Sequence, residues 1–351
     1  MTAVVDFHAH VTPRRFQAAI RSAGRWHGLA STVGELEVAG FRRTVEERVA
    51  DMDAAGVDVQ VISPNAGFYQ YDNEPTVTAV IARECNDEIA DMCAEHPDRF
   101  AGFGTLPMQE VRLAIEELER IMSRSTFKGV MVGDHVNGRT YDEPEFDPLW
   151  EAIHTLGAIV FFHQGSGTIV GGRISRYHLE NSVGNLTERA LTFGALVGGG
   201  ILDRYPTLKI ILGHAGGYTA FGAARMDRAW LAARELVGEG VDPAIALGGE
   251  LAGAAPSPAI APRDSPRPPS AYLRRFYYDC CTYTQQTLRF LIDAVGIDRV
   301  VLGTDYPAPM MIPDAVRWIR GLDALTEAEQ DGILWGNARA LLGIQPSQPR
   351  C

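Results

Sequence analysis

Short apolar, β-branched runs alternate along the chain with longer segments in which apolar residues recur at helical spacing. The short runs predict eight strands, at residues 3–7, 58–62, 100–105, 129–132, 158–162, 208–212, 276–278 and 299–302. The longer segments predict helices at residues 44–55, 75–96, 110–123, 148–156, 185–203 and 284–295. This alternation indicates an α/β fold with a parallel sheet. Eight strands favour a TIM-like (β/α)8 barrel, with an open doubly wound sheet as the alternative.

The length of the chain bounds its domain organisation. With 351 residues, of which 46% are hydrophobic, it suffices for one large barrel or two modest domains. We expect a single domain over residues 1–351. Residues 237–267 are rich in Gly, Ala and Pro and lack clear periodicity, so they predict an insertion. That insertion is a mobile surface segment or, alternatively, an active-site lid or subunit arm.

The composition excludes several classes of function. The formal net charge of −12 argues against a nucleic-acid surface, although a cleft can still be locally positive and bind an anion. No apolar stretch is long enough for a membrane span, and the N-terminus lacks the features of a signal peptide. The five cysteines form no CxxC pair, which indicates reduced thiols of a cytoplasmic protein. Glycine-rich phosphate loops are also missing, so nucleotide binding has no support.

Residues that bind metals or move protons close several of the predicted strands. His8 and His10 lie at the end of the first strand, two residues apart, so both side chains point to the same face. His163, His214 and Asp305 follow the fifth, sixth and eighth strands. In a barrel all these strand ends lie on one face, where active sites are built. We therefore predict a metal site formed by His8, His10, His163 and Asp305.

The lysines indicate a single ion. Barrels with two metals usually bridge them with a carboxylated lysine at the end of the fourth strand. This chain has only two lysines, Lys128 and Lys209, and both precede the strands that they adjoin. They should lie at the wrong end of the sheet, which also argues against Schiff-base chemistry.

The predicted ligands are three neutral imidazoles and one carboxylate, which leave a position for water or substrate. Zinc is the expected ion, with manganese as the alternative, and it would lower the pKa of bound water to near 7. His214 would then act as acid and base on that water, and Asp305 could also shuttle a proton. Arginine is the expected partner of a substrate carboxylate, and the candidates are Arg48, Arg173 and Arg225.

Several motifs resemble those of the amidohydrolase superfamily, and more narrowly the branch around 2-amino-3-carboxymuconate-6-semialdehyde decarboxylase. The resemblance rests on DFHAH at residues 6–10, GHAGG at 213–217 and GTDYP at 303–307, and it continues at residues 52–60, 224–230 and 266–270. It therefore covers nearly the whole chain.

This resemblance implies a distorted barrel with one zinc or similar ion, and nonoxidative decarboxylation of a small aromatic or unsaturated carboxylic acid. It carries the four ligands and the acid/base role of His214 over to this chain. Arg48 matches a substrate-binding arginine. Arg225 matches an arginine that reaches the active site of the neighbouring subunit, which implies a homodimer.

The chain departs from this branch at the insertion of residues 237–267 and in the loop at residues 164–168. Because that loop borders the substrate in the branch, the resemblance does not identify the substrate. A metal-dependent hydrolase or hydratase of an amide, lactone or enol is the alternative function. Two arginines converging on the open side of the metal would favour a carboxylate substrate.

Overall fold

The computed structural model describes residues 3–30, 36, 38–165, 167–171, 173, 176–241 and 265–343. Most of the predicted insertion, at residues 242–264, lies outside the described residues. Within the described chain, no helix is long and apolar enough to cross a membrane.

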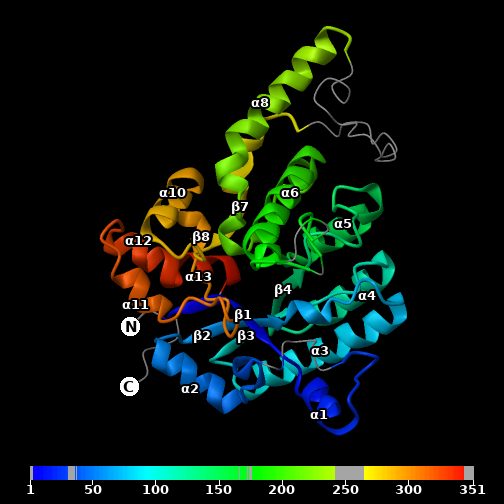
Figure 1. Cartoon of the computed structure of the whole chain (residues 1–351), viewed down its shortest axis with the longest axis vertical. Coiled ribbons are helices and arrows are strands. Elements are labelled where there is room, and N and C mark those ends of the chain that lie inside the picture. Colours follow the sequence, from blue (N-terminus) through cyan, green and yellow to red (C-terminus); the bar gives the residue numbers. More distant parts are fainter. Residues whose placement is uncertain are drawn as a thin grey trace.

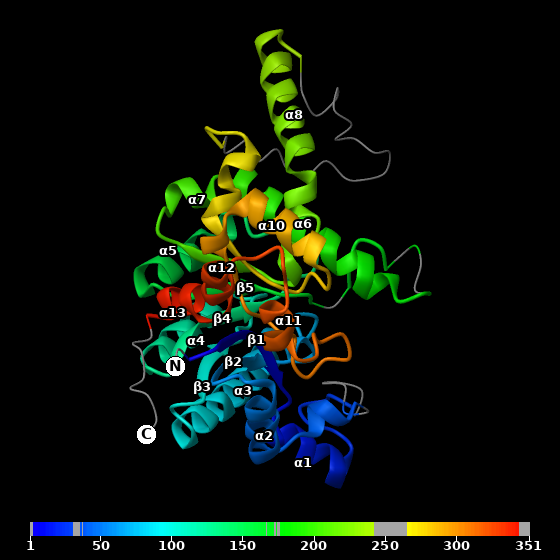
Figure 2. The same ribbon diagram turned by 90° about the vertical axis from the view of Figure 1, so that its left-hand side faces the viewer.

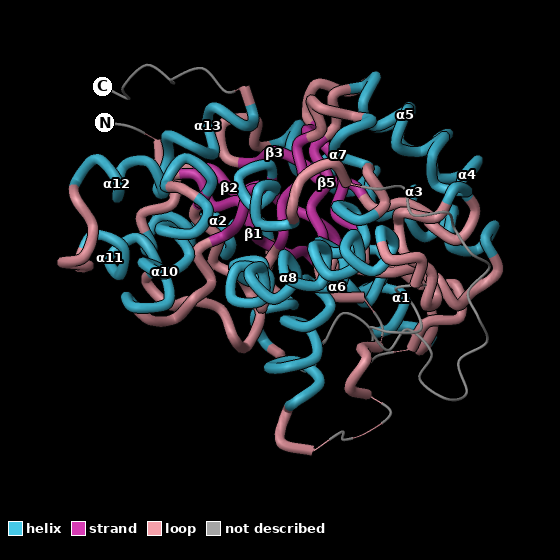
Figure 3. The backbone as a smooth tube through the Cα atoms, turned by 90° about the horizontal axis from the view of Figure 1, so that it is seen from above, coloured by secondary structure: helices cyan, strands magenta, loops and turns pink. Residues whose placement is uncertain are grey.

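Eight parallel strands form one sheet in the order of the sequence. They are β1 (Val5–Val11), β2 (Val59–Pro64), β3 (Phe100–Gly104), β4 (Phe127–Val132), β5 (Ile159–Phe162), β6 (Lys209–Leu212), β7 (Phe276–Asp279) and β8 (Val300–Val301). Backbone hydrogen bonds close the sheet between β1 and the end of β8, from Phe7 N to Leu302 O and from Asp305 N to His8 O. This confirms the predicted barrel. Figure 3 shows the strands at the centre with the helices around them.

The helices cover the outside of the strands (Figures 1 and 2). They are α1 (Arg14–Ala23), α2 (Val45–Ala55), α3 (Pro75–Glu95), α4 (Val111–Met122), α5 (Asp147–Leu156), α6 (Asn185–Gly198), α7 (Ile201–Arg204), α8 (Thr219–Gly238), α10 (Gln285–Val295), α11 (Ala315–Arg320), α12 (Glu327–Asp331) and α13 (Asn337–Leu342). In both views α8 projects from the body of the protein.

Local sequence explains where the helices begin and end. Thr44 and Glu47 form a capping box at the start of α2, and Gly56 ends that helix in the left-handed conformation. Gly157 ends α5 in the same way. The single helix predicted at residues 185–203 is instead two helices, because Gly200 adopts a φ of 67° between α6 and α7.

Both lysines lie at the amino ends of their strands, as predicted. Lys128 is the second residue of β4 and its Nζ donates to Ser125 O, while Lys209 opens β6 and donates to Leu341 O. Neither side chain comes from the end of a strand where a bridging ligand would lie.

Candidate active site

β1 carries two of the predicted ligands, and it extends further than the sequence indicated. The strand continues to Val11, so His8 and His10 lie inside it rather than at its end. The reason is that its second half is paired on both sides: His10 pairs with Ser63 of β2, and its N–H donates to Tyr306 O after β8. Because side chains alternate along a strand, both imidazoles face the barrel axis.

The other two ligands reach the same point from β5 and β8. His163 follows β5 directly, and Asp305 lies four residues beyond β8. One ligand atom from each of His8, His10, His163 and Asp305 lies within 4.8 Å of the others, and all four residues are buried. The Nε2 atoms of His8 and His10 are 3.1 Å apart, and Asp305 Oδ1 lies 3.4 and 3.1 Å from them. Ligands sharing a tetrahedral zinc ion are about 3.3 Å apart.

The hydrogen bonding of these residues fits a divalent cation. Both ring nitrogens of His163 are buried and have no hydrogen-bond partner among the described residues. Burial, with His10 and His8 adding to it, lowers the pKa of His163 well below its usual value, so the ring is a neutral ligand. Burial alone would raise the pKa of Asp305, but His8, His10 and His214 outweigh it and hold that pKa well below normal. The site therefore offers unpaired lone pairs and one negative charge.

Asp279, the last residue of β7, orients two parts of the site. Its carboxylate accepts a hydrogen bond of 2.8 Å from His8 Nδ1, which leaves His8 Nε2 for a metal. It also accepts from the backbone N–H groups of His214, Ala215 and Cys281, at 2.8, 2.7 and 3.1 Å. Burial would raise the pKa of Asp279, but the hydrogen bond and charge of His8 lower it. Asp279 therefore links a metal ligand to the backbone of the proposed acid/base.

A second set of buried polar residues forms a hydrogen-bond network that includes β1. Asp6 accepts from Thr304 Oγ1 at 2.7 Å and from Gln60 Nε2 at 3.1 Å. Arg48 donates to Gln60 Oε1 at 3.0 Å and to the carbonyl of His10, and its guanidinium lies 4.7 Å from the centre of the Tyr306 ring. Burial lowers the pKa of Arg48 to about 10. Arg48 therefore contacts the backbone of His10.

His214 lies beside the ligands in a turn after β6. It adopts a φ of 53° and Ala215 one of 57°, values that Asp279 helps to hold through both N–H groups. His214 Nε2 lies 3.8 Å from Asp305 Oδ2, and within the described part of the chain its Nδ1 has no hydrogen-bond partner. The ring is therefore close to the four metal ligands but is not one of them.

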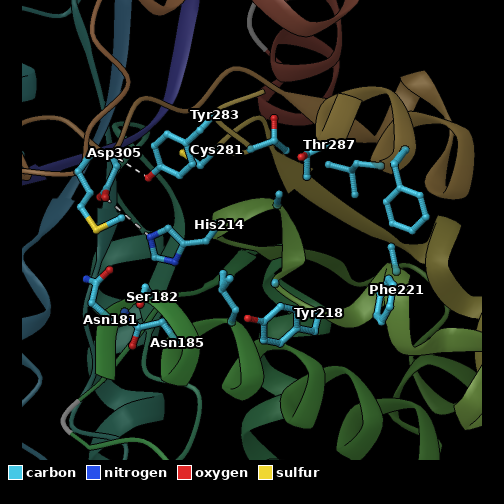
Figure 4. Close-up of a pocket in the computed structure, with 18 residues that line it drawn as sticks. Asn181, Ser182, Asn185, His214, Tyr218, Phe221, Cys281, Tyr283, Thr287 and Asp305 are labelled. Atoms are coloured by element: carbon cyan, nitrogen blue, oxygen red, sulfur yellow. Dashed lines mark hydrogen bonds and ion pairs between the residues drawn. The ribbon is translucent and has the colours of Figure 1, made fainter. Parts of the chain in front are cut away.

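A cavity of about 540 Å³ opens next to the ligands, and His214 and Asp305 form part of its wall. Figure 4 shows Asn181, Ser182 and Asn185 on one side of His214, and Tyr218 and Phe221 further along the cavity. Another part of the wall comes from α10 and the loop after β7, with Phe290, Leu291 and Tyr283 among its residues. The cavity is therefore a largely apolar chamber, of suitable size for a small ring compound, that reaches the metal ligands at Asp305.

Comparison with known proteins agrees with this geometry. The amidohydrolase family model matches residues 5–344, which is nearly the whole chain. The chain belongs to the amidohydrolase family.

Relatives of this amidohydrolase include several decarboxylases. The chain is 29% identical to the 2-amino-3-carboxymuconate-6-semialdehyde decarboxylase of Dictyostelium discoideum, over 98% of this chain and 92% of that protein. It is also 29% identical to a gamma-resorcylate decarboxylase of Polaromonas, over 85% and 87%. A crystal structure of a dihydroxybenzoic acid decarboxylase from Polaromonas, with manganese and 2-nitroresorcinol bound, matches with a TM-score of 0.77 and 26% identity, over 99% of this chain and 98% of that one.

The candidate arginines do not converge at the cavity, whereas the metal ligands converge on one point. Arg173 and Arg225 are exposed, in the loop after β5 and on α8 respectively. Among the described residues that line the cavity of this amidohydrolase, none is an arginine or a lysine. The two converging arginines expected for a carboxylate substrate are therefore not found within the described part of a single chain.

Two residues of the amidohydrolase site were not identified from the sequence. The seventh strand was predicted to stop at Tyr278, so Asp279 was not recognised as a residue at a strand end, although the same rule would have found it. Asn185 is the first residue of a predicted helix, and no sequence motif assigns it a role. Cys281 is buried and also lines the cavity.

Proposed function

We propose that this amidohydrolase is a metal-dependent nonoxidative decarboxylase of a small aromatic or unsaturated carboxylic acid. The observation that carries this proposal is the buried set of His8, His10, His163 and Asp305, in which both nitrogens of His163 lack a partner among the described residues. Asp305 of this set lines the same cavity as His214. Decarboxylases of aromatic or muconate-type acids among the relatives support it.

A divalent ion at these ligands would supply a Lewis acid that polarises oxygen atoms and stabilises negative charge on them. The reaction itself breaks the bond between the carboxylate carbon and the ring, or the alkene carbon. The electron pair of that bond stays on the carbon that loses carbon dioxide, and one proton must be added there. His214 is the residue we propose to hold and deliver that proton, because its ring faces the cavity and its backbone is fixed by Asp279.

The remaining residues are proposed to bind or to orient. Asp305 would ligate the metal and exchange a proton with His214, from which it is separated by 3.8 Å. Arg48 is proposed to act on substrate binding, and its contact with the carbonyl of His10 suggests that it does so through β1. Zinc is the ion we expect, because three imidazoles suit it, and manganese is the alternative.

We further propose a homodimer that works in the cytoplasm, with Arg225 contacting the substrate in the neighbouring subunit. The exposure of the apolar cavity mouth supports this arrangement, since 79% of Phe221 is exposed next to a cavity that opens to solvent. Arg225 lies one helical turn further along α8, which projects from the body of the protein (Figure 2). A second chain would supply the cation that the described lining of one chain lacks.

The proposal is tested by incubating zinc-loaded and manganese-loaded protein with hydroxybenzoates, aminobenzoates and muconate-type acids. We expect one class of acid to release carbon dioxide without oxygen, nicotinamide or pyridoxal cofactor. Chelation should abolish the release, and metal should restore it. Hydration or hydrolysis of a substrate without carbon dioxide would instead establish the alternative function. A hydratase of Sphingobium, 21% identical over 97% of this chain, makes that outcome worth measuring.

A further inference from the structure

We propose that Asn185 recognises a neutral hydrogen-bonding substituent, a hydroxyl or amino group, on the ring or chain of the substrate. This inference rests on the proposed function, because it treats the cavity beside the metal ligands as the place where an organic acid binds. It adds a specificity-determining residue, from α6, to a site otherwise built at the ends of strands.

The first observation is the state of the Asn185 side chain. Its exposed fraction is only 5%, and it lines the cavity. No hydrogen bond of its amide is found in the described chain, whereas the hydroxyls of Ser182, Tyr283 and Thr287 on the same cavity are paired with His178 O, Met310 O and Thr284 Oγ1. The Asn185 amide is not among the fully enclosed polar atoms that lack a partner, so it reaches the cavity, where a ligand or water would pair with it.

The second observation is that the segment carrying Asn185 is held rigidly. Residues Glu180–Gly184 form a π-helical turn directly before α6, a distortion that occurs frequently at functional sites. Glu180 and Glu188, on either side of Asn185, accept hydrogen bonds from the N–H groups of Thr168 and Ile169, at 2.8 and 2.7 Å. A Cβ atom on Gly184 would lie 2.2 Å from Thr168 Oγ1, so glycine is required for this close packing. Asn185 is therefore preorganised.

The third observation ties Asn185 to the proposed acid/base. The carbonyl of the next residue, Leu186, accepts a hydrogen bond of 3.1 Å from Tyr218 N, in the turn that begins at His214. Gly217 is required at this contact, because a Cβ atom there would lie 2.2 Å from Leu186 O. Asn185 and His214 both line the cavity (Figure 4). A substrate held beside His214 would thus have the Asn185 amide within the same chamber.

An amide suits a neutral polar group. It offers two N–H donors and a carbonyl acceptor, so it can pair with a hydroxyl or amino group but brings no charge to balance a second carboxylate. A buried site built to pair with a hydroxyl discriminates against analogues without one, because its own polar group is then left unpaired. We therefore expect the preferred substrate to carry such a group in addition to the carboxylate that is lost.

The experiment uses the metal-loaded protein and the probes benzoate and 2-, 3- and 4-hydroxybenzoate, with dissociation constants measured by calorimetry. Wild-type protein should bind at least one hydroxybenzoate roughly 10- to 100-fold more tightly than benzoate. Asn185→Leu, close in size but apolar, should abolish this preference while leaving benzoate binding within a few-fold. Ser182→Ala is the matched control, since its hydroxyl already donates to His178 O, and it should keep the preference.

The outcomes separate this inference from the proposed function. If no acid releases carbon dioxide but Asn185→Leu still abolishes the hydroxyl preference, the proposed reaction fails and the recognition role stands. The role of Asn185 is overturned if wild-type protein shows no hydroxyl preference or binds none of the probes. It is also overturned if Asn185→Leu weakens benzoate and hydroxybenzoates equally. Thermal unfolding and metal content of the variant must match the wild type, and Asn185→Ala provides a second variant if leucine does not fit.

Discussion

Two buried polar clusters at the carboxyl end of the barrel differ in how their atoms are paired. The metal cluster, His8, His10, His163 and Asp305, brings imidazole lone pairs and a carboxylate to one point and leaves both nitrogens of His163 unpaired. The charged pair, Asp134 after β4 and Arg189 on α6, is equally buried, but its two charges contact each other. The Nε and Nη1 nitrogens of Arg189 have no partner among the described residues, yet they are donors and cannot bind a cation.

This difference in pairing distinguishes a binding site from a structural contact. Burial does not distinguish the two clusters, because both are buried and both hold residues whose charge is costly inside a protein. Only the metal cluster has unpaired lone pairs that converge, so only it requires an ion to be satisfied. The charged pair instead connects α6, which carries Asn185, to the loop after β4.

Removal of a ligand should have the largest effect. We expect His163→Ala to lose the metal and to reduce decarboxylation to the background rate, because no other described residue offers its lone pair at that point. Elemental analysis and carbon dioxide release measure the two losses, and circular dichroism checks the fold. If His163→Ala kept stoichiometric metal and full activity, the claim that this cluster is the metal site would be wrong.

His214→Ala should separate proton transfer from metal binding. The variant should keep its metal, because the four ligands remain, but turnover should fall by about 10²- to 10⁴-fold. The exposed His27 provides a control, since His27→Ala removes an imidazole that contacts only Glu84 among the described polar groups and should leave turnover unchanged. If His214→Ala lost its metal and was active once reconstituted, His214 would be a ligand rather than the acid/base.

The sequence was sufficient for the barrel because eight apolar runs lie between helical segments, and for the ligands because strand ends share one face. It could not show that β1 continues through His10, since that depends on partners in β2 and after β8. The sequence also could not show that Arg48 binds the carbonyl of His10, because a lone arginine on a helix carries no information about tertiary contacts. Asp279 escapes the strand-end rule because the predicted seventh strand is one residue too short.

Arg189→Met should reveal the structural role of the charged pair. It leaves the carboxylate of Asp134 buried without its counterion, so we expect a loss of about 3–5 kcal/mol in the free energy of unfolding at pH 8. Chemical denaturation of the metal-loaded protein measures it. The double variant Arg189→Met, Asp134→Asn should recover much of the loss, because no uncompensated charge remains. A single-variant loss below about 1 kcal/mol would mean that the pair contributes little.

Asp279→Asn should have a smaller effect on the metal cluster. The asparagine keeps the size of the side chain but removes the charge that orients His8 Nδ1–H, so the affinity for zinc should fall roughly 10- to 100-fold. Competition with a chromophoric chelator measures this affinity without reference to activity. Unchanged affinity would show that the hydrogen bonds from the backbone of His214 and Ala215 are the main role of Asp279.

The last prediction concerns the pH dependence of the charged pair, an effect spread over several pH units. Burial raises the pKa of Asp134 to about 7, although Arg189 and Thr192 act to lower it. An unfolded aspartate titrates near pH 3.9, so between about pH 4 and 7 the folded protein holds a proton that the unfolded chain has released. Stability from this group is therefore present at low pH and is lost as the pH rises through 7. Relative to Asp134→Asn, the wild type should lose up to about 1.4 kcal/mol per pH unit across this range. Denaturation at several pH values measures the difference, and parallel curves for the two proteins would show instead that Arg189 keeps Asp134 ionised throughout.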